Sequence, residues 1–149
     1  MHPACDIMED MVDYGKFEKS LIRLEAQLHN YRACAERTEL GDLDRDAIAE
    51  SVIQRFEVCY DCLRKVLKRH LRENMWIPEP PNSPKPLFRV AFENRLFNSI
   101  ERWLLYADAR VSTSHDYSEG KAQAAADGAF GFAEDAAVLY RTMTGKPWT

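Results

Sequence analysis

The sequence lacks the long apolar run of a membrane protein and the strong charge bias of a general nucleic-acid binder. No apolar stretch approaches the ~20 residues that a membrane-spanning helix needs. The first residues also lack the basic start and apolar core of a secretion signal. The 20 basic and 24 acidic residues give a net charge of −4, so any contact with RNA has to be local. We therefore expect a soluble, cytoplasmic protein with no membrane contact.

Cysteine is sparse, with four residues in 149, and no secretion signal accompanies them, so a disulfide framework is not expected. Cys59 and Cys62 form a Cys-x-x-Cys pair in the middle of a helical pattern, with no second pair or nearby histidine to complete a zinc site. A redox pair would favour a helix N-terminus, where the thiolate is stabilised. The chain also lacks a clustered set of acidic and histidine ligands. We expect no metal and no cofactor.

Sustained alternation of apolar and polar residues, the pattern of a half-buried strand, is absent too. Apolar residues instead recur every three or four positions, which predicts helices over about 13–39 and 45–74. The acidic residues at 42–44 suit the start of the second helix. Cations in its C-terminal half either complement the helix dipole or help to hold a phosphate. They are Arg64, Lys65, Lys68, Arg69, His70 and Arg72.

Five prolines fall within residues 77–86, which predicts a stiff, extended and non-helical linker between helices. Ser83 before Pro84 suits the cap of a third helix. A fourth helix should begin near residue 98 and end at the hydroxyl residues 112–114, and a fifth should run from about 118 to 142.

These elements together predict an all-α fold, an up-and-down bundle of four to five helices. We expect one domain over residues 1–149, with its core at about 14–143. Gly128 and Gly131 thin one face of the last helix, which would let another helix or subunit approach closely.

The residues suited to chemistry gather between Arg110 and Tyr117. Arginine offers a planar fork of donors to a phosphate, histidine can move a proton near neutral pH, and the tyrosine hydroxyl can be modified. Arg110 and His115 are five residues apart, so an ideal helix would separate them by about 140° around its axis. They can converge only if the helix ends among residues 112–114 or if two chains share the site.

Each of these residues also has a structural interpretation. Arg110 can serve as a helix-end cation or as the ion-pair partner of Asp108 or Asp116. His115 can cap or pack beneath the last helix, and Tyr117 can be an interface aromatic whose hydroxyl stays in water.

Several segments resemble one known family. They are the string Ile-Gln-Arg-Phe-Glu-Val-Cys-Tyr at 53–60, the string Phe-Arg-Val-Ala-Phe at 88–92, Trp103, and the Arg-x4-His-x-Tyr pattern at 110–117. In this order they are similar to the nucleotidyltransferase substrate-binding proteins, helical-bundle members of the HEPN superfamily that are related to the HepT toxins. The resemblance implies a partner, a minimal nucleotidyltransferase encoded beside the protein, and a homodimer or larger homo-oligomer.

The resemblance to the HepT branch implies roles for the motif residues. There the arginine and histidine, here Arg110 and His115, form a metal-independent ribonuclease site from two subunits, and the tyrosine, here Tyr117, receives adenylate from the partner enzyme. In such a site, His115 would act as general base on a ribose 2′-hydroxyl and Arg110 would stabilise charge at phosphorus. Supporting or binding roles are expected for Arg55, Glu57, Ser114 and Asp116.

Two classes of function follow, and whether the chain is an enzyme stays open. The favoured one is a substrate- or nucleotide-binding subunit that docks a nucleotidyltransferase, in a two-component system of the toxin–antitoxin type. The alternative is a HepT-like ribonuclease toxin that adenylylation of Tyr117 silences. A helical scaffold with an inactive motif is a third possibility.

Overall fold

The fold is described by a computed structural model that covers residues 12–113 and 121–148. This part of the chain is helical, and it contains no strand, which confirms the predicted all-α bundle. The helices are α2 (Gly15–Ala33), α3 (Asp42–Asn74), α4 (Pro84–Glu93), α5 (Ile100–Ser112) and α6 (Lys121–Thr144), with a short 3-10 turn, η1, at Cys34–Glu36.

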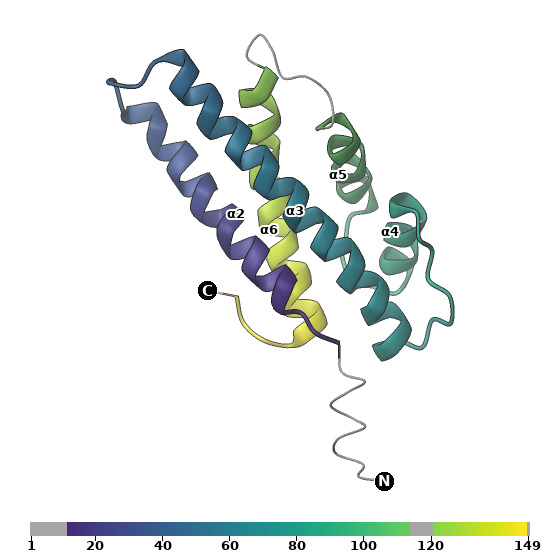
Figure 1. The fold of residues 1–149 in the computed structure, drawn as a ribbon. Helices are drawn as coiled ribbons and strands as arrows, with labels where there is room; N and C mark the ends of the chain where they lie inside the picture. The colour runs from purple at the N-terminus through teal and green to yellow at the C-terminus, as the bar shows by residue number, and fades with distance from the viewer. Residues whose placement is uncertain (1–11, 114–120, 149) are drawn as a thin grey trace.

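The helices run up and down around α3, the longest of them (Figure 1). Helices α2 and α3 lie side by side and antiparallel, and α2 also contacts α6. Helices α4 and α5 together return along the other side of α3, so that these two shorter helices occupy one position of the bundle. None of the described helices is both long enough and apolar enough to cross a membrane.

The first connection is longer than expected, because α2 stops at Ala33 and not near residue 39. Arg45 holds the turn that follows: its Nη1 donates to the carbonyl of Leu40 at 2.7 Å and its Nη2 to that of Arg37 at 2.9 Å. The Asp44 carboxylate accepts from the backbone N–H of Gly41 at 3.0 Å. Helix α3 therefore begins at its acidic residues, as predicted, but three residues earlier than the apolar stripe alone indicated.

The proline-rich linker was predicted to be non-helical throughout, and this is wrong at its end. Pro84 and Pro86 lie in the first turn of α4, where a residue needs no N–H donor for the helix. Ser83 holds the N-cap position as expected, although its side chain makes no capping hydrogen bond. The linker is tied back to α3 at Asn82, whose side-chain oxygen accepts from the Lys68 ammonium.

His70 is also not the helix-end cation that the sequence suggested. Its ring is only 6% exposed, and Nδ1 lies 2.7 Å from the Tyr14 hydroxyl and 3.3 Å from Nδ2 of Asn74. Burial lowers the pKa of His70, so the ring is held in its neutral form. The contact of Tyr14 with α3 therefore uses the neutral His70 ring as a hydrogen-bond acceptor, and not a charged imidazolium.

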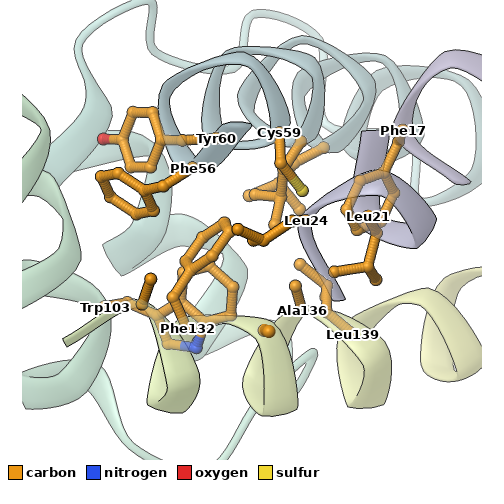
Figure 2. Packing of buried hydrophobic residues seen from close by; sticks show 14 of the residues in the cluster. Phe17, Leu21, Leu24, Phe56, Cys59, Tyr60, Trp103, Phe132, Ala136 and Leu139 are labelled. Carbon is orange, nitrogen blue, oxygen red and sulfur yellow. The ribbon is translucent and has the colours of Figure 1, made fainter. Parts of the chain in front are cut away.

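The core is an aromatic cluster between α3, α5 and α6 that continues as an aliphatic layer against α2 (Figure 2). Trp103 is 2% exposed, and its ring centroid lies 5.3 Å from that of Phe88; Phe56 and Phe132 pack edge to face at 4.9 Å. Cys59 lies in the same core with no exposed surface, and burial raises the pKa of its thiol to about 12. A protonated, buried thiol suits apolar packing and not redox chemistry.

Candidate functional site

Helix α5 ends at Ser112, among the hydroxyl residues where the sequence predicted a break. The Ser112 hydroxyl donates to the carbonyl of Asp108 at 3.1 Å, and the Thr113 hydroxyl donates to that of Arg110 at 2.7 Å. Arg110 is among the last four residues of α5, whose carbonyls lack an intrahelical partner, so the Thr113 hydroxyl satisfies one of them; the Ser112 hydroxyl bonds back to the preceding turn. The last turn of α5 therefore presents Arg110 toward the middle of α3.

Arg110 is held there by two carboxylates of α3. Its Nε and Nη2 donate to the two oxygens of Asp61, both at 3.2 Å, and its Nη1 donates to Oε2 of Glu57 at 3.0 Å. The Thr113 hydroxyl lies 3.0 Å from the same Glu57 oxygen. We call these four side chains, Glu57, Asp61, Arg110 and Thr113, the Arg110 cluster. Of the two partners that the sequence suggested for Arg110, Asp108 pairs instead with Lys85 at 2.7 Å, and Asp116 lies outside the described residues.

The charges of the Arg110 cluster do not favour an anion. One guanidinium faces two carboxylates, which leaves the cluster with a formal charge of −1. The hydrogen bonds that Arg110 donates to Asp61, followed by the charges of Asp61 and Glu57, raise the pKa of Arg110 above its ordinary value, so the cation is strongly retained. A phosphate would have to displace a bidentate carboxylate and overcome repulsion from both acids.

An apolar pocket of about 440 Å³ opens beside the Arg110 cluster, between α3, α5 and α6. Thr113 and Ser112 contribute hydroxyls to its wall, and none of the described residues that line it is charged. At Gly128, an added Cβ would meet nothing within 4 Å, whereas one at Gly131 would lie 3.4 Å from the Tyr106 hydroxyl. The close approach predicted at the two glycines is therefore made by α5 at Gly131, and Gly128 leaves open space.

The structure thus brings Glu57 to Arg110 but places Arg55 elsewhere, in a pocket between α2 and α3. The remaining predicted site residues, Ser114, His115, Asp116 and Tyr117, lie outside the described residues. Asp61 and Thr113 were not predicted as site residues from the sequence. The spacing of Glu57 and Asp61, four residues apart on one helix, is a usable signal for two carboxylates on a common face.

The described residues also contain no group of three or more histidines, cysteines or acids that could hold a metal ion.

With this geometry in hand, comparison with known proteins identifies the family. Residues 12–145 match the family described as "Nucleotidyltransferase substrate binding protein like". The chain belongs to this family. The match runs through all five described helices, so the Arg110 cluster lies within the family domain.

Two individual proteins are similar to parts of the chain. The protein named probable ribonuclease HepT of Haemophilus influenzae is 30% identical over 82 residues, which are 54% of this chain and 56% of that protein. The chain thus spans little more than half the length of this curated relative. The crystal structure of a protein from Thermus thermophilus has a similar fold, with a TM-score of 0.63 and 25% identity over 81% of this chain and 98% of that one.

Proposed function

We propose that this chain is the substrate- or nucleotide-binding subunit of a two-component system and that its partner is a minimal nucleotidyltransferase. The observation that carries the proposal is the family match across residues 12–145, whose description names substrate binding for a nucleotidyltransferase. The resemblance of the sequence to this family implies that the partner is a separate protein encoded beside it. The chain would then contribute a helical surface and ligand contacts, while the transferase contributes the chemistry.

The state of Arg110 supports a binding subunit over a nuclease. A ribonuclease would need this guanidinium to face the phosphorus centre, and its donors are instead taken by Asp61 and Glu57. The neighbouring pocket is apolar, which suits a protein or ligand surface without charge better than an RNA phosphate. Arg110 thus acts chiefly to fasten α5 to α3.

Complex formation tests the proposal. The purified chain is mixed with the nucleotidyltransferase encoded beside it, and the mass of the product is followed by size-exclusion chromatography with light scattering. We expect a complex that contains both proteins, with at least two copies of this chain. Two separate peaks at concentrations of tens of micromolar would contradict the proposal.

A HepT-like ribonuclease is the second candidate, favoured by the 30% identity to probable ribonuclease HepT. In this case, His115 of one chain would remove a proton from the ribose 2′-hydroxyl, and adenylylation of Tyr117 would silence the enzyme. Ser114 and Asp116 would support that segment. The test is RNA cleavage in the presence of a chelator, by the wild-type chain and by His115→Ala. Cleavage that the variant loses, and that the partner transferase suppresses, would replace the first proposal by this one.

A further inference from the structure

A second pocket, of about 310 Å³, lies between α2 and α3, which run side by side in Figure 1. Four cations line it, together with Ser20, Val58 and Cys62: the cations are Lys16, Lys19, Arg23 and Arg55. We call it the cationic pocket. Such a concentration of positive charge is unexpected in a chain whose net charge is −4.

The four cations of the cationic pocket have no acidic partner among the described residues. Within residues 12–113 and 121–148, none of them takes part in an ion pair or a side-chain hydrogen bond, although six ion pairs form elsewhere. Lys16, Lys19 and Arg23 are exposed, and Arg55 is partly buried. The cations therefore repel one another without compensation from the protein.

The carboxylates of α2 explain part of this imbalance, because both of them accept hydrogen bonds from α6 or from the C-terminal segment. Glu18 accepts from the Tyr140 hydroxyl of α6 at 3.1 Å. The two oxygens of Glu25 accept from the Trp148 indole N–H at 2.9 and 3.0 Å. Helix α2 thus carries its acids on the side of α6 and the C-terminal segment. Its cations Lys16, Lys19 and Arg23 line the groove against α3, whereas Arg32 lies over the Phe130 ring of α6.

Two carboxylates of α3 that follow Arg55 in the sequence are also paired on another side of the helix. Glu57 and Asp61 turn toward α5, where Arg110 holds them. Hydrogen bonds of α2 with α6 and the C-terminal segment, and ion pairs of α3 with α5, therefore hold these four acids away from the α2–α3 groove. What remains there is a recessed site with four cationic side chains, suited to an anion of high charge.

The lining of the cationic pocket narrows the class of anion. No aromatic ring is among its described lining residues, so it offers no platform on which bases could stack, as single-stranded RNA sites do. Among the residues that the structure describes, Val58 and Cys62 make up its apolar wall. Four cations around a small volume match a compact chain of phosphates better than an extended backbone whose charges are spread along a strand.

We propose that the cationic pocket binds the triphosphate group of a nucleotide. The nucleotide in question would be the one that the partner transferase uses, so this inference rests on the proposed function and locates the ligand within it. The α-phosphate, sugar and base would lie at the mouth of the pocket, where the transferase, which acts at the α-phosphorus, could reach them. Arg55 would then be a binding residue that acts independently of the Arg110 cluster.

Binding of simple phosphates to the purified chain tests this inference, by calorimetry in a chelator at low salt. We expect tripolyphosphate and ATP to bind with similar affinity, AMP to bind at least tenfold more weakly, and all affinities to fall steeply with added salt. Lys19→Ala and Arg55→Ala should each weaken tripolyphosphate binding about tenfold, since each removes a charge-assisted contact. Arg89→Ala, an exposed arginine of α4 outside the pocket, is the matched control and should bind as the wild type does.

Protection of Cys62 from alkylation provides a second test, which reports where the phosphate ligand binds. Cys62 is partly exposed in the wall of the pocket, whereas Cys34 and Cys59 are buried. Saturating tripolyphosphate should slow alkylation of Cys62 by iodoacetamide at least threefold, as measured by peptide mass spectrometry, while AMP at the same concentration should not.

Three results would overturn the inference: no binding of tripolyphosphate, equal binding by the two pocket variants and the wild type, or unchanged labelling of Cys62 at saturation. Tighter binding of a 12-nucleotide RNA than of ATP, with the same dependence on Lys19 and Arg55, would assign the pocket to RNA instead. Complex formation with the transferase is measured separately and without nucleotide. Failure of the triphosphate site alone therefore leaves the partner proposal standing.

Discussion

Replacing Arg110 by alanine should destabilise the fold through the two acids that it leaves behind. Glu57 and Asp61 are four residues apart on α3, so they lie on the same face of the helix. With Arg110 in place, each carboxylate has a cation at 3.0–3.2 Å. Without it, two like charges face each other across one helical turn, and α5 loses its polar attachment to α3.

The expected loss of unfolding free energy is about 2 kcal/mol. The side chains of Arg110, Glu57 and Asp61 are 29%, 26% and 42% exposed, so water screens the pairs and each contributes on the order of 1 kcal/mol or less. The repulsion that remains between the two acids adds about 0.2–0.5 kcal/mol. A larger effect would require a buried pair, which this is not.

A double-mutant cycle with Asp61→Asn measures the coupling free energy between Arg110 and Asp61. In the wild-type background, Asp61→Asn removes the bidentate pair and should cost about 1 kcal/mol. In the Arg110→Ala background, the same change removes a repulsive charge and should stabilise slightly, so its effect changes sign. The assay is urea unfolding followed by far-ultraviolet circular dichroism. An Asp61→Asn effect that is equal in both backgrounds would refute the pairing, and so would a loss below about 0.5 kcal/mol for Arg110→Ala.

Three further predictions concern the fold. Because the pKa of His70 is lowered in the folded state, protonation favours unfolding; the unfolding free energy of the wild type should fall relative to that of His70→Gln as pH drops below about 6.5, and parallel pH profiles would contradict this. Gly128→Leu enters open space and should be tolerated, whereas Gly131→Leu should displace Tyr106 and lower the thermal midpoint; equal midpoints would contradict the packing. Trp103→Ala should cost about 3–5 kcal/mol in urea unfolding, and a cost below about 1 kcal/mol would show that the aromatic core is wrongly placed.

Local signals in the sequence were sufficient for most of the helices. The acidic residues at 42–44 indicated the start of α3, and the hydroxyl residues at 112–114 indicated the end of α5, because both act within one helical turn. The end of α2 was misjudged, since the turn after it depends on Arg45 reaching back to the carbonyls of residues 37 and 40. Pro84 and Pro86 were misread because proline is excluded from the interior of a helix but not from its first turn.

The pairing of side chains between helices could not be predicted from the sequence. Apolar periodicity shows which face of a helix is buried, but it does not show which neighbour covers that face. Arg110 meets Asp61 across 49 positions of the chain, and that contact depends on how α5 is set against α3. The cationic pocket likewise needs the register of α2 against α3 to bring Arg55 to Lys19 and Arg23. Burial of His70 against Tyr14 has the same origin.

The most direct test of a substrate-binding subunit is the affinity of the nucleotidyltransferase for its nucleotide with and without this chain. Calorimetric titration of ATP into the transferase alone, and then into the purified complex, measures this difference. We predict that the complex binds ATP at least tenfold more tightly than the transferase alone. An affinity that the chain leaves unchanged would contradict its assignment as the subunit that binds the substrate.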